Sequence, residues 1–183
     1  MDDSKNQASS DLSKVTDRLS LYQNHLLPTA SSAANSPSPT TSPMSRDPIT
    51  CHVLNTLTGT PAANLPVTLE LLSSPSTATS SNVRFTATTN ADGRIASWKP
   101  ATEDAYRVPE ILESLSAPES KTNWALRFEV GPWFEAQGVE SFWPEVEVKF
   151  TVKGRGKEGK EGWRHYHVPV LLGPWNYSTY RGS

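Results

Sequence analysis

The sequence predicts an all-β domain, a two-sheet antiparallel β-sandwich of about eight strands with one short helix. Two observations favour this class. Apolar residues recur with period two over short segments, and helical spacing is rare between them. The chain also combines 15 Pro and 10 Gly, which mark turns, with 6 Trp, 5 Tyr and 5 Phe, aromatic residues that favour strands.

The strands are predicted one by one from this alternation. The clearest is 145–152, where Val146, Val148, Phe150 and Val152 alternate with polar residues and so share one face. Alternation or flanking turn residues predict the others at 49–55, 67–71, 83–87, 94–98, 124–130, 165–172 and 177–180. Asp92-Gly93 predicts a hairpin turn, residues 153–162 predict a solvated loop, and the short helix is expected at 133–137.

The chain divides into two parts by composition. In residues 1–46, 19 side chains are Ser, Thr or Pro and Tyr22 is the only aromatic one. Such a segment buries too little apolar area to offset its ordering entropy, so we expect a disordered N-terminal tail. Residues 47–183 are then expected to form one domain.

Charge, hydropathy and cysteine content exclude several classes of protein. With 17 Lys or Arg against 19 Asp or Glu, the formal net charge is −2, which argues against a nucleic-acid binder. No apolar run approaches the roughly 18 residues of a membrane-spanning helix. A single cysteine and no apolar segment after Met1 predict a reducing, intracellular compartment without a secretory signal.

Three histidines are predicted on exterior sheet faces. Tyr166, Val168 and Val170 share the core face of their strand, so His165 and His167 project together from the opposite face. By the same phase argument His52 lies opposite the apolar residues of its strand, as does Thr50. These imidazoles are either solvated strand residues or a zinc site, with His52, His165 and His167 as ligands and an open position for water.

Two further residues are candidates for chemistry. Arg94 follows the Asp92-Gly93 turn, so its guanidinium is either solvated or placed for bidentate recognition of a carbonyl-rich heterocycle. Cys51 has the core phase and no cationic neighbour in sequence, which predicts a buried, inert thiol.

Four segments in this order resemble the 5-hydroxyisourate hydrolase family, whose members are related to transthyretin. They read ITCHVLN at 49–55, TNADGR at 89–94, HYHVP at 165–169 and YRGS at 180–183. The FWPEV segment at 142–146 is also similar to the family, and the YRGS ending distinguishes its enzymes from transthyretin. This sequence departs from the family at Cys51, where a small hydroxyl residue is more usual, and in a longer loop at 154–162.

The resemblance implies a transthyretin-like (prealbumin-like) sandwich assembled as a homotetramer, without a cofactor. It implies hydrolysis of 5-hydroxyisourate, the product of urate oxidase, to 2-oxo-4-hydroxy-4-carboxy-5-ureidoimidazoline. Carried over motif by motif, the catalytic residues are His52, Arg94, His167 and Ser183. Tyr180, Arg181 and Gly182 are implied to shape the substrate pocket, and His165 is assigned a supporting place. A non-enzymatic ligand carrier with the same fold is the remaining alternative.

The implied chemistry suits these residue types. A neutral imidazole, whose ordinary pKa is about 6.5, is the natural general base for water near neutral pH, so His52 or His167 is expected in this role. Arg94 is expected to stabilise negative charge on the attacked carbonyl oxygen. Ser183 is expected to hold water or substrate by hydrogen bonds.

The tail contains a pattern that resembles the type-2 peroxisomal targeting signal. Arg18-Leu19 is followed, after five residues, by His25-Leu26. Residues seven apart are separated by nearly two helical turns, so these four would share one helix face for an import receptor. We therefore expect a peroxisomal protein, with the cytoplasm as the alternative.

Overall fold

The computed structural model describes residues 46–74, 83–102 and 105–183. The predictions for the tail, including Arg18, Leu19, His25 and Leu26, lie outside the described residues. The rest of this subsection concerns the described residues of the compact unit that spans 43–183. No helix in the described part of the chain has the length and apolar character needed to span a bilayer.

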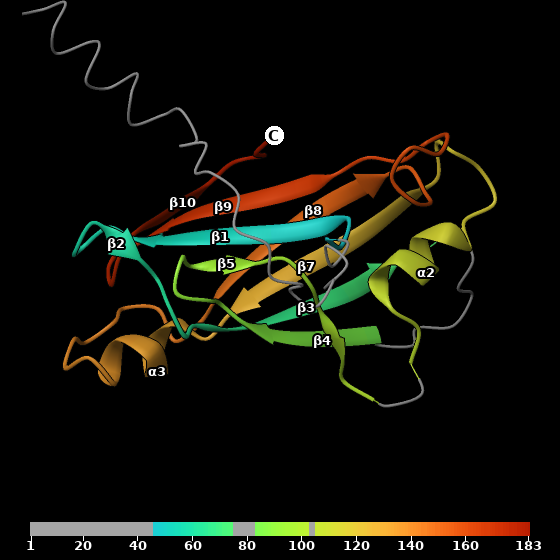
Figure 1. Cartoon of the computed structure of the whole chain (residues 1–183). Coiled ribbons are helices and arrows are strands. Elements are labelled where there is room, and N and C mark those ends of the chain that lie inside the picture. The colour runs from blue at the N-terminus through green and yellow to red at the C-terminus, as the bar shows by residue number, and fades with distance from the viewer. Residues whose placement is uncertain (1–45, 75–82, 103–104) are drawn as a thin grey trace, which may run out of the picture. The chain divides into compact units, whose positions relative to one another are not determined.

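In the described part of the chain, ten strands form two sheets (Figure 1), which confirms the predicted all-β class. The first sheet has the order β10-β9-β1-β2, with β5 also paired to β1. Its strands are β1 (Ile49–Asn55), β2 (Thr60–Pro61), β5 (Arg94–Ile95), β9 (Tyr166–Leu172) and β10 (Tyr177–Thr179). The second sheet has the order β6-β4-β3-β7-β8. Its strands are β3 (Pro66–Ser73), β4 (Val83–Thr88), β6 (Lys99–Pro100), β7 (Lys121–Phe128) and β8 (Val146–Lys153).

The strand prediction differs from the structure in three respects. There are ten strands in the described residues, because β2 and β6 are two residues long and too short to show a period. The predicted strand 94–98 ends after two residues, at Ile95. The pair β1 and β9 is parallel, whereas all other pairs are antiparallel.

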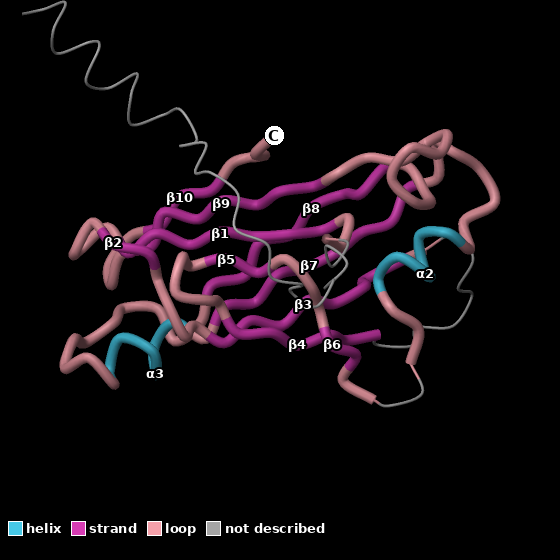
Figure 2. The backbone as a smooth tube through the Cα atoms, in the orientation of Figure 1, coloured by secondary structure: helices cyan, strands magenta, loops and turns pink. Residues whose placement is uncertain are grey.

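Among the residues that the structure describes, two short helices accompany the sheets, where one was predicted (Figure 2). Helix α3 (Val130–Glu135) begins three residues before the predicted segment 133–137. Helix α2 (Val108–Glu113) was not predicted, because six residues give fewer than two turns for a period to appear. A Glu110 carboxylate accepts the backbone N–H of Arg107 at 2.8 Å and so satisfies one free donor at the start of α2.

The two sheets enclose one core of side chains from both. Ile49, Cys51 and Val53 of β1 are fully buried, as are Leu69 of β3 and Trp124 of β7. This alternation on β1 leaves the second and fourth residues of the strand, Thr50 and His52, on the outer face, as the phase argument predicted. The fold therefore presents the polar side of β1 and β9 away from the core.

The segment after β5 is held against β1 by one large side chain. The indole Nε1 of Trp98 donates to the carbonyl oxygen of Ile49 at 2.8 Å, and the Trp98 backbone N–H donates to the Asp47 carboxylate at 2.7 Å. Trp98 is buried, so both polar groups need these partners. This anchor gives the functional site described below one wall, formed by Ile95 and Ala96.

Candidate active site

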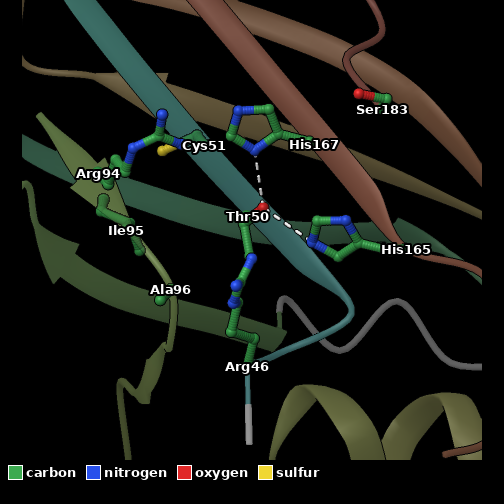
Figure 3. Close-up of a pocket in the computed structure, with 9 residues that line it drawn as sticks. All are labelled: Arg46, Thr50, Cys51, Arg94, Ile95, Ala96, His165, His167 and Ser183. Atoms are coloured by element: carbon green, nitrogen blue, oxygen red, sulfur yellow. Dashed lines mark hydrogen bonds between the residues drawn. The ribbon is translucent and has the colours of Figure 1, made fainter. Parts of the chain in front are cut away.

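The parallel pairing of β1 and β9 brings two histidines to one hydroxyl group. The register sets Thr50 opposite His167, and His165 lies just before β9 begins. The Thr50 Oγ1 lies 2.8 Å from Nδ1 of His167 and 3.0 Å from Nε2 of His165 (Figure 3). Both distances are those of hydrogen bonds.

Four aromatic rings form a row across this outer face. Trp163 and His165 stack with ring centroids 6.4 Å apart and planes 13° from parallel. His165 and His167 follow at 6.2 Å and 19°, and His167 and His52 at 6.4 Å and 30°. The structure thus brings together the three histidines that the sequence placed on exterior faces.

The turn before β5 places Arg94 beside the same row of histidines. Gly93 has φ +70°, and a Cβ there would lie 2.4 Å from the carbonyl oxygen of Val53, so only glycine fits. The Asn90 side chain accepts the backbone N–H groups of Asp92 and Arg94, at 3.0 and 2.8 Å. The resulting register pairs Arg94 with His52 across the two strands.

The YRGS segment returns to β9 next to the histidines. Gly182 donates its backbone N–H to the carbonyl oxygen of His167 at 2.9 Å, as an isolated antiparallel bridge. A Cβ on Gly182 would lie 2.7 Å from Cδ2 of the His167 ring and 3.0 Å from Cγ of Pro169. Glycine is therefore required for this close approach, which brings Ser183 to the pocket.

These elements line one cavity of about 270 Å³. Its lining residues are Arg46, Thr50, Cys51, Arg94, Ile95, Ala96, His165, His167 and Ser183. His52 stacks on His167 but is not among them. Tyr180 and Arg181 line a neighbouring groove, and His167 lines this groove as well as the cavity. The Arg181 guanidinium lies 5.5 Å from the centre of the Tyr166 ring.

The charged side chains that line the cavity are cationic. Two arginines line it and no Asp or Glu side chain does. In the described part of the chain, neither Arg46 nor Arg94 forms an ion pair with a carboxylate. Guanidinium groups without carboxylate partners are suited to a carbonyl-rich or anionic ligand.

All three imidazoles are biased towards the neutral form. Burial lowers the pKa of His52 and of His167 below the ordinary 6.5, and the positive charge of Arg94 lowers each of them further. Burial also lowers the pKa of His165, with Arg46 acting in the same direction. Neutral imidazoles are the forms that accept a proton from water, so the site is equipped with candidate bases at pH 7.

Cys51 is a different kind of group in the same wall. Its side chain is fully buried, and burial raises the pKa of its thiol to about 12. The thiolate is therefore almost absent near neutral pH, and the structure agrees with the predicted inert thiol.

The zinc alternative does not fit this geometry. Three imidazoles that bind one zinc ion at about 2.0 Å in tetrahedral geometry have ring centres about 5 Å apart. Here the rings are stacked in a row at larger separations, and two of the ring nitrogens face Thr50. Among the described residues, no three His, Cys, Asp or Glu side chains are grouped to hold a metal.

Two polar lining residues, Thr50 and Arg46, had no functional role in the sequence analysis. Thr50 was placed on the polar face of its strand, but its bonds to His165 and His167 depend on a strand pairing that alternation does not reveal. Arg46 was assigned to the tail, and its contribution to the cavity depends on where β1 begins. No signal in a single sequence identifies Thr50 or Arg46 as a residue of the site.

A solved structure has the same fold. The crystal structure of transthyretin from Sparus aurata matches with a TM-score of 0.53 at 24% identity, and the match covers 75% of this chain and 97% of that one. The chain is thus a transthyretin-fold protein, whose outer sheet face carries a pocket lined by histidine and arginine.

The sequence profile of the HIUase/Transthyretin family matches residues 49–182, so the chain belongs to this family. A Schizosaccharomyces pombe protein named probable 5-hydroxyisourate hydrolase is 38% identical, over 74% of this chain and 90% of its own length. The 5-hydroxyisourate hydrolase of Mus musculus is 36% identical, over 74% of this chain and 95% of its own length. The resemblance noted in the motifs is confirmed.

Proposed function

We propose that this chain is a hydrolase that opens the ring of 5-hydroxyisourate, giving 2-oxo-4-hydroxy-4-carboxy-5-ureidoimidazoline in urate degradation. The observation that carries the proposal is the cavity itself, where His167, Arg94 and Ser183 meet from three separate motifs. The family membership and the names of the relatives support the same substrate.

The reaction follows from the groups present. A neutral imidazole, His167 or His52, takes a proton from water, whose oxygen attacks a ring carbonyl carbon. Arg94 donates hydrogen bonds to the oxygen on which negative charge develops. The ring C–N bond then breaks, and the proton held by the imidazole goes to the leaving nitrogen. The Ser183 hydroxyl lies at the same cavity and orients the water or the substrate.

A spectrophotometric assay tests this proposal. Urate oxidase generates 5-hydroxyisourate from urate, and addition of the protein is expected to accelerate its decay, with the same rate in the presence of a chelator. His167→Ala and His52→Ala are each expected to lower kcat/KM by about 10²-fold or more. Unchanged decay with the folded protein would overturn the proposal, and loss of activity on chelation would favour the zinc alternative.

The same site also distinguishes a hydrolase from a ligand carrier. A ligand carrier needs a complementary cavity but no base, whereas here neutral imidazoles lie beside an arginine. If the protein binds 5-hydroxyisourate without accelerating its decay, the carrier reading replaces the hydrolase.

We also propose that the working form is a homotetramer, as the resemblance implies. Strands β8 and β10 lie at the ends of their sheets, so their outer backbone N–H and C=O groups have no strand partner within the described sheets. Exposed aromatic side chains lie near the β10 edge, among them Trp175 and Tyr177. Apolar surface of this kind supports self-association.

For the location we propose peroxisomal delivery, with import through the segment Arg18, Leu19, His25 and Leu26. The support is the spacing of these residues, together with a substrate that urate oxidase produces. A fluorescent protein fused after residue 46 is expected to enter peroxisomes in cells with a working type-2 receptor, and Arg18→Ala with His25→Ala to disperse it. Uniform cytosolic fluorescence of the unmutated fusion would move the enzyme to the cytoplasm.

A further inference from the structure

The Thr50 hydroxyl occupies a position that restricts the protonation of two histidines at once. It lies within hydrogen-bond distance of Nδ1 of His167 and Nε2 of His165, as the dashed lines in Figure 3 mark. Thr50 is itself buried, only 5% exposed, so water has little access to replace either partner. Its position is set by the central strand β1, which pairs with β9 along seven registered positions.

A hydroxyl group carries one hydrogen, so it donates one hydrogen bond and accepts others. If Thr50 donates to His167, the bond with His165 requires a hydrogen on Nε2 of His165. If Thr50 donates to His165, the bond with His167 requires a hydrogen on Nδ1 of His167. The Thr50 oxygen could also accept from both rings, but the described residues offer its hydrogen no other acceptor. With that hydrogen bonded, both contacts are made only when the two facing nitrogens together carry one hydrogen.

We propose that Thr50 is a positioning residue that couples the tautomers of His165 and His167. In the second of these arrangements, the hydrogen on Nδ1 of His167 leaves Nε2 of that ring with its lone pair, as a general base requires. The supporting histidine thus acts through the hydroxyl, by fixing which nitrogen of His167 is the basic one.

The coupling also gives a route for the proton. When Nε2 of His167 takes a proton from water, its Nδ1 hydrogen moves to Thr50, and the Thr50 hydrogen moves to Nε2 of His165. The hydroxyl is restored, His167 is neutral again and His165 carries the positive charge. The reverse movement returns the proton to the leaving nitrogen, so the cycle is balanced.

Thr50→Val removes the hydroxyl while keeping the β-branched shape that suits a central strand. Thr50→Ser keeps the hydroxyl and loses a methyl group. The kinetic consequence rests on the proposed hydrolase function, whereas the coupling of tautomers is measured without substrate. The two parts of the inference are therefore tested by separate readouts.

The first readout is the ¹⁵N chemical shift of the imidazole nitrogens at pH 8, where both rings are neutral. In the unmutated protein, the fractional protonation of Nδ1 of His167 and Nε2 of His165 is expected to sum to about one. The sum is expected to depart from one in Thr50→Val and to be kept in Thr50→Ser. Facing nitrogens that are both protonated or both bare in the unmutated protein would overturn the coupling.

The second readout is the rate of 5-hydroxyisourate decay. Thr50→Val is expected to lower kcat about tenfold or more with KM changed less than about threefold, because the basic tautomer of His167 is no longer fixed while the substrate contacts are kept. Thr50→Ser is expected to recover kcat to within about threefold. Equal loss in both variants would assign Thr50 a packing role, and full activity in Thr50→Val would refute the catalytic part while leaving the NMR result to decide the coupling.

Discussion

At the residue scale, the chemistry of this site depends on environments that shift ordinary side chains. Burial lowers the pKa of His52, His165 and His167, and the guanidinium groups of Arg46 and Arg94 act in the same direction. An arginine in this cavity therefore lowers the pKa of a neighbouring imidazole, in addition to the substrate contact that we propose for Arg94.

The first prediction concerns the acid limb of the pH profile, the range in which kcat/KM falls as the pH is lowered. Protonation of an essential imidazole stops catalysis, and because its pKa in the folded protein is lowered, the midpoint of the acid limb of kcat/KM is expected below pH 6.5. Arg46→Gln removes a positive charge that lowers the pKa of His165 and His167, so it is expected to move the limb to higher pH.

The matched control for this prediction is Arg84→Gln, which removes an arginine from the other sheet, where it pairs with Glu70. Its acid limb is expected to coincide with that of the unmutated protein. An acid-limb midpoint above pH 6.5 in the unmutated protein, or the same midpoint in both arginine variants, would show that these charges do not lower the pKa of the base.

The second prediction concerns Cys51. A thiol with a pKa of about 12 is roughly 10⁻⁴ ionised at pH 8, and the thiolate is the reactive form. The native protein is expected to react with a disulfide reagent at a rate limited by unfolding, and the denatured protein to release one equivalent, because the chain has one cysteine. Rapid labelling of the native protein would contradict the burial of this side chain.

At the scale of elements, a strand pair, a hairpin turn and the C-terminal segment each bring residues to the site. The parallel pair β1 and β9 presents Thr50 and His167, the turn at Gly93 presents Arg94, and the bridge at Gly182 brings Ser183 back. Each of the two glycines is required by a distance below 3.0 Å to a Cβ that glycine lacks. Glycine at these two positions thus allows the turn and the C-terminal segment to approach their neighbours closely.

The third prediction tests the bridge. Gly182→Ala places a methyl group against His167 and Pro169 and is expected to displace residues 180–183 from β9. Because a displacement of about 1 Å at a catalytic group can cost 10²-fold, kcat is expected to fall by at least about tenfold. The melting temperature is expected to change little, since Tyr180 and Arg181 are exposed.

Ser178→Ala is the control, because Ser178 lies in β10 on an exposed position of the same chain segment. It is expected to keep both activity and stability. Unchanged kcat in Gly182→Ala would show that the close approach of this segment is not needed for catalysis.

At the scale of the whole molecule, the described residues form two sheets around one core and leave a polar outer face on β1 and β9. The pocket lies on this outer face, so catalysis does not interrupt the packing that stabilises the sandwich. The open ends of the sheets, at β8 and β10, border the groove next to the pocket, and the proposed association occurs there.

The fourth prediction is the mass in solution. Light scattering is expected to give about four chain masses for the unmutated protein, as the proposed homotetramer requires. Trp175→Glu introduces a charge on a side chain that is 64% exposed near β10, and it is expected to lower the mass if this edge is an interface. Tyr106→Glu, on an exposed aromatic residue before α2, is the control and is expected to keep the tetramer. A monomeric mass for the unmutated protein would refute this assembly.

The sequence by itself determined the fold class and the faces of the strands. Alternation is a local property, so it placed Cys51 in the core and His52 and His167 outside it without knowledge of any partner strand. The motifs identified the family, because the segments at 49–55, 89–94, 165–169 and 180–183 are each recognisable locally and occur in the family's order.

Only the tertiary structure decided which of these residues meet. The pairing of Thr50 with His165 and His167 joins positions more than 100 residues apart, and a strand's period carries no information about its neighbour or its direction. The helix α2 and the strands β2 and β6 were missed for a related reason: they are too short to show a period, and contacts with distant segments specify them instead.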